Sequence, residues 1–367
     1  MITEEQKDTL ALYGVPGVGA RTHARLAGRF GTPADVFRAS KKELMELDGI
    51  GPVVANNIQT FNRHGFVQDQ IKRMERAGAS ILIRSSENYP SLLNAFKSAP
   101  PVLFVRGDSH ALSELSIAFV GTRKPTDYGV KMTRKLVMGS VNAGMCVVSG
   151  MAAGIDSTAH REALDRGGKT VAVFGCGVDI IYPSVNRKLS EDIMKSGCLV
   201  SHFPMGTGCR AGSFPARNAV IVGLSLGTVV VEAPEGSGAL ITAELTLKAG
   251  RKLFAVPGNI DSPKSEGTNN LIAKGAHTAF NSDTILNLLG KPMPSHKEGT
   301  VIDYEDRRPP PPGLAGEVLK VLCDGPLQIE SICSSLGKPV SSILNELTNL
   351  EMDNYVTQKP GKIFERN

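Results

Sequence analysis

The chain has 367 residues, with 41 Lys and Arg against 36 Asp and Glu, and a formal net charge of +5 at pH 7. This length exceeds what one ordinary hydrophobic core accommodates, so we expect two or three domains. The small excess of positive charge permits a polyanionic partner without requiring one. Because the sequence has no apolar run of about eighteen residues and no charged-then-apolar leader, we expect a cytoplasmic protein that makes no membrane contact.

The cysteines indicate a reduced interior. None of the six forms a C-x-x-C pair, and Cys146, Cys176 and Cys198 lie inside apolar runs. This usage is typical of a cytosolic chain with thiols in its core, and it disfavours a metal site.

Residues 1–79 are predicted to form a helical domain of the helix-hairpin-helix (SAM-like) type. Val15–Gly19 and Leu47–Gly51 are similar apolar-Gly-apolar-Gly turns, followed by helical patterns over Arg21–Phe30 and Val53–Phe61. Paired glycines of this kind let backbone N–H groups approach a nucleic-acid phosphate. Alternatively, the turns serve packing or contact with a partner, and the sequence leaves this open. The basic face of the first helical pattern consists of Arg21, Arg25 and Arg29.

Residues 80–290 have a different pattern, in which short apolar runs alternate with helix-length segments. Such runs predict the strands of a parallel sheet that helices cover on both faces. The alternation predicts an α/β fold with a doubly wound parallel sheet, in which each crossover between parallel strands is right-handed. Ile81–Ile83 and Val102–Val105 are predicted strands that precede the alternation. The predicted strands of the alternation are Ile117–Val120, Met145–Val148, Val171–Phe174, Cys198–Val200, Val229–Val231 and Leu253–Val256, with a last strand near His277–Phe280.

Glycine-bearing loops follow most of these strands. No G-x-G-x-x-G stands after the first strand of the alternation and no G-x-x-x-x-G-K-[ST] is present, which disfavours NAD binding and ATP hydrolysis. Several loops at one sheet edge, near helix N-termini, suit an extended phosphodiester better than one small cofactor, so we expect no cofactor. The loops are Gly121–Lys124, Ser149–Gly150, Gly175–Gly177, Gly236–Gly238 and Pro257–Asn259.

The predicted phosphate contacts lie in and beside these loops. Arg123 follows a strand end, where its planar guanidinium can hold two phosphate oxygens. Arg217 and Asn218 would supply a second cation and an amide, and the loop glycines would let backbone amides approach. Alternatively, the glycines serve tight turns only, and Arg123 pairs with Asp156 or Glu232. The predicted set is Gly121, Thr122, Arg123, Lys124, Ser149, Gly150, Gly154, Arg217, Asn218, Ser237, Gly238, Lys264 and Lys274.

An ordered series of motifs between about Tyr89 and Phe280 carries a family resemblance. The motifs are Val120–Arg123, Ser149–Asp156 with His160, Tyr182–Pro183, Phe214–Asn218, Val231–Ala233, Ser237–Gly238 with Thr242, Val256–Gly258, Gly267–Asn269 and Gly275–Ala276. This series resembles the DNA-processing protein A (DprA/Smf) family. The resemblance implies an extended Rossmann-like fold and single-stranded DNA binding. It also implies protection of incoming DNA in natural transformation, loading of the recombinase RecA, and a homodimer.

One departure from the family pattern is visible. Where the family commonly has Ser-Glu before a proline, this chain has Ser201–Pro204 with His202. A histidine can change its charge near neutral pH. We nevertheless expect a partly exposed loop histidine without a mechanistic role.

An enzyme is the alternative function. Rossmann-like phosphoribohydrolases place a strand-end Glu beside a Gly-rich loop, and Glu232 next to Gly236–Gly238 resembles that arrangement. Hydrolysis requires a poised acid and base. The sequence offers no such pair at a sensible spacing, so we expect a binding protein without catalytic residues.

Charge and aromatic content predict how the chain binds DNA. Residues 80–290 contain 21 basic and 16 acidic side chains, against 11 and 9 in residues 1–79 and 9 and 11 from Lys291 onward. Attraction by charge therefore favours the sheet domain. Aromatic residues make up only 5% of the chain, and Tyr182 and Phe214 are the ones near the loops. We expect backbone-dominated binding that weakens steeply with salt.

The remaining sequence predicts a tether and a winged helix. Lys291–Gly313 is rich in Pro and charge and should be extended. Winged helices commonly read duplex DNA with the third helix. Here the third helix has no Arg or Lys, and Leu314–Asn367 holds five basic and seven acidic residues, which favours protein contact over duplex binding. The predicted elements are helices Ala315–Leu322, Ile329–Leu336 and Val340–Met352 and strands Tyr355–Thr357 and Lys362–Phe364.

Overall fold

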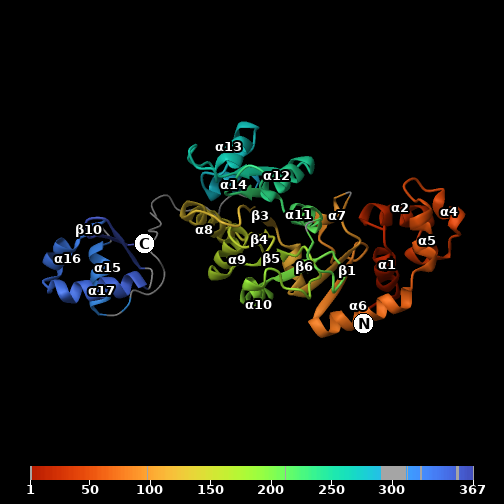
Figure 1. Ribbon diagram of the computed structural model, residues 1–367, viewed down its shortest axis with the longest axis horizontal. Coiled ribbons are helices and arrows are strands. Elements are labelled where there is room, and N and C mark those ends of the chain that lie inside the picture. The colour runs from red at the N-terminus through yellow and green to blue at the C-terminus, as the bar shows by residue number, and fades with distance from the viewer. Residues whose placement is uncertain are drawn as a thin grey trace. The chain divides into compact units, whose positions relative to one another are not determined.

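The computed structural model describes residues 2–96, 98–210, 212–290, 311, 313–322, 325–352 and 355–366. The chain divides into two compact units, Met1–Ser295 and His296–Asn367 (Figure 1). Most of the predicted tether Lys291–Gly313 lies outside the described residues. None of the helices formed by the described residues is long and apolar enough to cross a membrane.

Six helices precede the sheet, and the two predicted hairpin turns lie between them, one before α2 and one before α5. Gly17 and Gly49 have φ values of 90° and 83°, which side chains other than glycine rarely adopt. Gly19 and Gly51 are the N-caps of the helices that follow the two turns. The helix-hairpin-helix prediction is confirmed. The helices are α1 (Glu4–Gly14), α2 (Ala20–Phe30), α3 (Pro33–Arg38), α4 (Lys41–Met45), α5 (Pro52–Thr60) and α6 (Arg63–Ala77).

A nine-stranded sheet forms the centre of the first unit, in the order β1-β2-β6-β5-β4-β3-β7-β8-β9. The seven strands from β6 to β9 in this order are parallel, and β2 and β1 extend the sheet antiparallel to their neighbours. The strands are β1 (Ala79–Ile83), β2 (Val102–Gly107), β3 (Ser116–Val120), β4 (Cys146–Ser149), β5 (Thr170–Val173), β6 (Cys198–Ser201), β7 (Gly227–Val230), β8 (Lys252–Ala255) and β9 (His277–Thr278). The predicted doubly wound sheet is confirmed.

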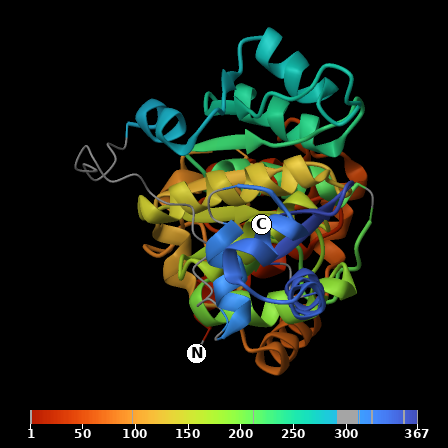
Figure 2. The ribbon, with the colours of Figure 1, turned by 90° about the vertical axis from the view of Figure 1, so that its left-hand side faces the viewer.

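Helices cover both faces of this sheet (Figure 1 and Figure 2). Alternate side chains of one strand enter different cores, because successive strand residues point to opposite faces. Ile117 and Phe119 pack with α8, α9 and α14, whereas Ala118 and Val120 pack with α11 and α12. The helices are α7 (Ser91–Asn94), α8 (Asp127–Asn142), α9 (Ile155–Asp165), α10 (Arg187–Ser196), α11 (Ser213–Leu224), α12 (Gly238–Lys248), α13 (Glu266–Ala273) and α14 (Ser282–Leu288).

The N-terminal helices pack on the sheet within the same compact unit. Leu10 of α1 and Met74 of α6 belong to one buried cluster with side chains of β2 and α10. Gln70 donates to Met205 O at 3.2 Å, and its Oε1 accepts from Met205 N at 2.8 Å. Two hydrogen bonds and shared apolar burial therefore join α6 to the loop after β6.

His202 differs from its prediction as a partly exposed loop residue. The side chain is buried, and its Nδ1 lies 2.9 Å from the Tyr13 hydroxyl of α1. Burial lowers the pKa of His202 to about 4, so the imidazole is neutral at physiological pH. The residue is buried because α1 covers the loop after β6.

The strand order decides which loops share an edge. β4, β5 and β6 follow β3 on one side of the sheet, whereas β7, β8 and β9 lie on its other side. The order therefore reverses between β3 and β7. All carboxyl ends of these parallel strands lie on one edge, which we call the carboxyl rim, and ligands of open α/β sheets bind at such rims.

The second unit is a winged helix, as predicted. Its three strands pair in the order β10-β12-β11. The third helix contributes Ile343, Leu347 and Leu350 to the core, and its exposed positions carry no cation. The elements are α15 (Leu314–Val321), β10 (Leu327–Gln328), α16 (Ile329–Leu336), α17 (Val340–Met352), β11 (Val356–Lys359) and β12 (Ile363–Arg366).

Candidate nucleic-acid interface

Loops after β3, β4 and β5 and the start of α11 enclose a pocket of about 100 Å³ at the carboxyl rim. We call it the Arg123 pocket. It is lined by Arg123, Gly150, Ala152, Ala153, Gly175, Cys176, Tyr182, Pro183, Cys209, Phe214 and Arg217. Three of the predicted contact residues, Arg123, Gly150 and Arg217, are therefore brought together here.

The loop between β4 and α9 forms one wall in a conformation that requires support. Met151 and Gly154 have φ values of 63° and 84°, and a positive φ at a residue such as Met151 costs free energy. Asp156 Oδ2 accepts hydrogen bonds from Gly150 N at 3.1 Å and from Ala152 N at 3.3 Å. Asn186 Nδ2 donates to Met151 O at 2.9 Å. Buried hydrogen bonds thus stabilise the backbone of this wall.

Gly154 and Gly121 let the loops after β3 and β4 touch. Ile155 N donates to Thr122 O at 3.2 Å. A Cβ at Gly154 would lie 2.4 Å from Thr122 O, and one at Gly121 would lie 2.6 Å from Ile155 Cγ1. Both glycines therefore allow close packing between two loops, which neither of the two interpretations of the glycines had specified. Their contribution is to position Arg123.

Arg123 is the exposed cation of the pocket. Its guanidinium makes no hydrogen bond or ion pair with the described residues, so the alternative pairings with Asp156 and Glu232 do not form. Its Cζ lies 5.4 Å from the centre of the Phe214 ring, within the range of a cation–π contact. The aromatic ring holds the side chain at the pocket and leaves its N–H donors available.

Arg217 lies near the same ring but is buried. Its Cζ is 5.6 Å from the Phe214 ring centre. Nε donates to Asn218 Oδ1 at 2.9 Å, and Nη1 donates to Val173 O at 3.0 Å and to Gly150 O. The guanidinium therefore joins α11 to the ends of β4 and β5. Two backbone carbonyls occupy Nη1 and the Asn218 side chain occupies Nε, so these donors are already engaged, and the predicted phosphate contact of Arg217 stays a prediction.

Asp156 and Arg217 are opposite charges buried under the pocket. Burial raises the pKa of Asp156, and the nearby Arg217 opposes this shift. Burial lowers the pKa of Arg217, Asp156 raises it, and the positive charge of Arg123 lowers it. Two cations thus lie near one ring with a single buried carboxylate beneath them. The exposed side of the pocket is electropositive and suits an anion.

Four other predicted contacts are buried and already bonded. Ser149 donates to Phe119 O at 2.6 Å, and Thr122 N donates to Glu232 O at 2.7 Å. Asn218 accepts from Arg217, and Gly150 lies against the same guanidinium. Ser149, Thr122 and Asn218 are buried and do not line the pocket, so they organise the loops from inside, whereas Gly150 also lines the pocket.

A second crevice, of about 430 Å³, lies at the same rim beside β3, β7 and β8. Its lining residues are Thr126, Tyr128, Glu232, Pro257, Gly258, Asn259, Ser262 and Ser265. None of these described residues is a cation. Glu232 is 2% exposed, and its two oxygens accept from Thr126 N at 2.9 Å and from Thr126 Oγ1. This carboxylate caps the start of α8.

The remaining predicted residues lie outside the Arg123 pocket. Lys124 is exposed beside Arg123, whereas Ser237 is the N-cap of α12 and Gly238 begins that helix. Lys264 is half-buried, and its carbonyl accepts from Ala233 N at 2.9 Å. The predicted contact of Lys274 with DNA stays a prediction. Lys274 is the C-cap of α13, and the first turn of this helix contacts the rim where Gly267 N donates to Ala233 O at 2.9 Å.

Two features of the pocket were not predicted from sequence. The electrostatic influence of Arg217 on Asp156 arises where the loop before α9 and the start of α11 meet at the carboxyl rim, and no local pattern indicates it. Cys209 lines the pocket from the loop before α11. Arg210, an exposed cation close in sequence to Phe214, is the signal that could have indicated that this loop contributes to the site.

Three family models match the chain. Residues 80–290 match the model described as DNA recombination-mediator protein A. Residues 9–71 match a helix-hairpin-helix motif, and residues 304–362 match a DprA winged helix domain.

Individual relatives agree with these models. Protein Smf of Synechocystis sp. (strain PCC 6803) is 33% identical over 100% of both chains. The X-ray structure of DNA processing protein A from Streptococcus pneumoniae has a TM-score of 0.68 at 29% identity, covering 78% of this chain and 98% of that one. A DNA processing protein A structure from Helicobacter pylori, described for its single-stranded DNA binding mode, has a TM-score of 0.53 at 33% identity. It covers 58% of this chain and 96% of that one.

Proposed function

This chain belongs to the DNA recombination-mediator protein A family, and on that premise we propose that it binds single-stranded DNA at the Arg123 pocket. The observation that carries the proposal is Arg123 itself, which is exposed, has free donors and lies against Phe214. A guanidinium can hold a phosphodiester, and Phe214 and the half-exposed Tyr182 offer surfaces on which bases stack. Such contacts recognise a strand without reading its sequence.

The chain acts by binding rather than by catalysis under this proposal. The enzymatic alternative requires Glu232 to act on a substrate. Glu232 is buried, and both of its oxygens accept hydrogen bonds from Thr126. A carboxylate engaged in capping α8 is a poor general base, which supports a recombination mediator over a hydrolase.

Replacing Arg123 by alanine tests the site. We expect the affinity for a single-stranded oligonucleotide to fall about ten- to hundredfold, since a charge-assisted hydrogen bond contributes about 1.5–3 kcal/mol. The slope of log affinity against log salt should fall by about 0.7, the value for one phosphate contact on a single strand. Fluorescence anisotropy titrations at several salt concentrations measure both quantities.

Arg134→Ala is the matched control for Arg123→Ala. Arg134 is exposed on α8 and has no side-chain partner among the described residues, so its loss removes one charge outside the pocket. Equal titration curves for the wild type and Arg123→Ala would remove Arg123 from the site. A wild-type affinity that does not change with salt would argue against phosphate capture altogether.

The family also suggests contacts with RecA and with a second copy of the chain, which we propose as further parts of the function. Several large apolar side chains that follow β7 in sequence are exposed, and exposed apolar surface commonly marks protein contacts. These side chains are Ile241, Leu247, Ile260, Phe280 and Leu288. The winged helix, whose α17 has no Arg or Lys, suits contact with a protein better than contact with duplex DNA.

Deleting Leu314–Asn367 separates these roles. We expect single-strand affinity to stay within about twofold of the full chain, because the pocket lies in the first compact unit. A dimer mass in light scattering should persist in the shortened chain if the residues after β7 form the contact. A large loss of affinity on deletion would show that the winged helix holds DNA directly.

A further inference from the structure

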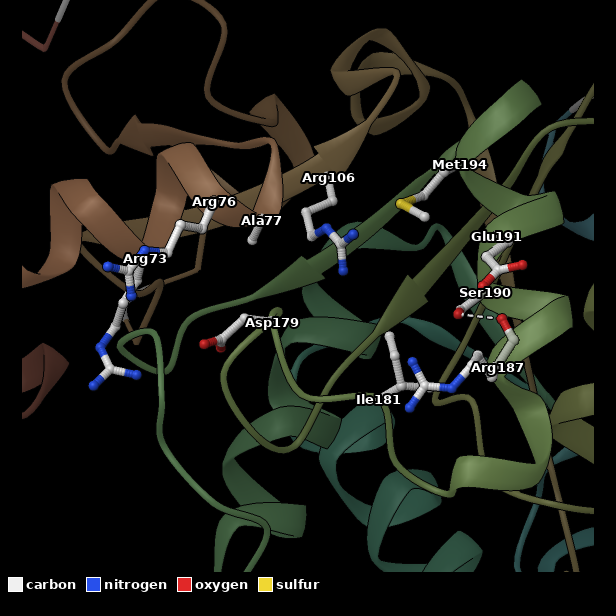
Figure 3. Close-up of a pocket in the computed structure, with 10 residues that line it drawn as sticks. All are labelled: Arg73, Arg76, Ala77, Arg106, Asp179, Ile181, Arg187, Ser190, Glu191 and Met194. Carbon is white, nitrogen blue, oxygen red and sulfur yellow. Dashed lines mark hydrogen bonds between the residues drawn. The ribbon is translucent and has the colours of Figure 1, made fainter.

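A second basic pocket, of about 400 Å³, lies between α6, β2 and α10. We call it the arginine pocket. Four arginines line it and no lysine does (Figure 3). The lining residues are Arg73, Arg76, Ala77, Arg106, Asp179, Ile181, Arg187, Ser190, Glu191 and Met194. None of them is among the DNA contacts predicted from sequence, because they come from three distant segments.

Arg106 extends from β2 into the pocket with unsatisfied donors. Its Nε is buried and has no hydrogen-bond partner among the described residues, and its Nη1 reaches Val178 O only at 3.4 Å. Burying a donor without a partner costs free energy, which a ligand oxygen would recover. Figure 3 shows Arg106 from β2 and Arg187 from α10 extending toward the same central space.

The charges of the pocket favour an anion. Four arginines against Asp179 and Glu191 leave a net charge of +2. Both oxygens of Asp179 accept from Gly206 N at 3.0 Å, and Arg73 pairs with Asp69 at 2.8 Å. The side chains of Arg76 and Arg187 are exposed and have no partner among the described residues. Their guanidinium groups can each bind a phosphate through two oxygens.

One loop connects this pocket with the Arg123 pocket. Cys176, Tyr182 and Pro183, which follow β5, line the Arg123 pocket. Asp179, Ile181 and Arg187 of the same segment line the arginine pocket. The two sites therefore lie on two sides of residues 176–187. Tyr182 is 50% exposed on this segment, where a base can stack on it.

We propose that the arginine pocket holds the phosphate backbone of the same DNA strand beyond the Arg123 pocket. This inference rests on the proposed function, because it extends the DNA path from the carboxyl rim to α6. None of the ten described lining residues is aromatic, so the pocket offers a base no stacking surface. That composition suits a phosphodiester backbone better than a free nucleotide, whose base would be left unrecognised.

A double variant, Arg76→Gln with Arg187→Gln, tests the proposal in the full chain. Both side chains are exposed and unpaired, so the substitutions leave packing intact. The control is Arg134→Gln with Arg161→Gln, which removes two exposed, unpaired arginines from α8 and α9. Affinity is measured for oligonucleotides of about 5 and about 16 nucleotides, the range of single-strand site sizes. Inorganic phosphate and dTMP serve as competitors.

We expect the pocket variant to bind the longer oligonucleotide at least about tenfold more weakly than the control does, and to bind the shorter one equally well. The salt slope for the longer one should fall by about 1.4, or 0.7 for each of two contacts. An unchanged affinity for the longer strand, with Arg123→Ala still weakening both, overturns this inference and leaves the proposed function standing. Equal losses at both lengths also overturn it.

The competitors distinguish the source of the phosphate. Phosphate or dTMP that binds the wild type and not the pocket variant, with the longer oligonucleotide unaffected, identifies a small-anion site and overturns the DNA path. A wild-type chain that binds neither oligonucleotide overturns the proposed function together with this inference.

Discussion

Replacing Asp156 by alanine is expected to lower the free energy of unfolding by about 2–5 kcal/mol, because two backbone amides lose their acceptor and the buried Arg217 loses a nearby negative charge. Arg217 would stay buried without its nearby carboxylate. Gly150 N and Ala152 N would lose their acceptor, and each unsatisfied buried donor costs about 1–3 kcal/mol. Urea denaturation followed by circular dichroism measures the loss. Single-strand affinity should also fall, because these bonds hold a wall of the Arg123 pocket.

Two variants show whether the effect belongs to the buried carboxylate. Asp165→Ala removes an exposed carboxylate from the last turn of the same helix, α9, and should change stability by no more than about 0.5 kcal/mol. Asp156→Asn keeps an oxygen that can accept from the two amides but removes the charge beside Arg217. The loss of unfolding free energy in Asp156→Asn should fall between the losses in Asp156→Ala and Asp165→Ala. If Asp156→Ala lowers the free energy of unfolding no more than Asp165→Ala does, the buried carboxylate of Asp156 does not stabilise the rim.

Replacing Gly154 by alanine is expected to cost about 2–5 kcal/mol and to weaken DNA binding together with stability. Gly154 has φ 84° and ψ −128°, a region that residues with a Cβ avoid. The new Cβ would lie 2.4 Å from Thr122 O and 2.8 Å from Arg123 Cα. These are backbone atoms, which cannot rotate away as a flexible side chain does. The loop that carries Arg123 would therefore be displaced.

Gly167→Ala is the matched control for Gly154→Ala. Gly167 follows the same helix with φ 68°, and a Cβ there would meet no atom within 4 Å. Gly167→Ala should lower the free energy of unfolding by about 1 kcal/mol, because of the left-handed backbone alone, and should leave oligonucleotide affinity unchanged. Denaturation and anisotropy titrations on both variants measure the difference. Equal losses for the two glycines would show that the contact with the Arg123 loop is not tight.

The strands of the sheet were predictable because a strand buried on both faces requires a nearly continuous apolar run. The run from Ile117 to Val120 meets this requirement, with alternate residues entering two different cores. The two-residue strand β10 was not predicted, since it exists only through pairing with β12. For the same reason, the apolar run of β2 indicated a strand but not its antiparallel place beside β6.

The sequence indicated the carboxyl rim and three residues that line the pocket, but not which of their side chains is exposed. Arg123 and Arg217 both stand in matched motifs, and the sequence treats them alike. The fold leaves Arg123 exposed against Phe214 and buries Arg217 between Gly150 and Val173. Which of two such arginines is accessible depends on the loops that close over it, and those loops come from other parts of the chain.

The sequence by itself determined the order of helices and strands, the glycine turns and the rim where the loops gather. These features depend on local periodicity and on backbone conformations that glycine alone adopts easily. Only the tertiary structure decided that Asp156 lies near Arg217 and that Arg76, Arg106 and Arg187 line one pocket. Exposure, pairing and local charge depend on neighbours that are distant along the chain, and no local pattern of residues specifies those neighbours.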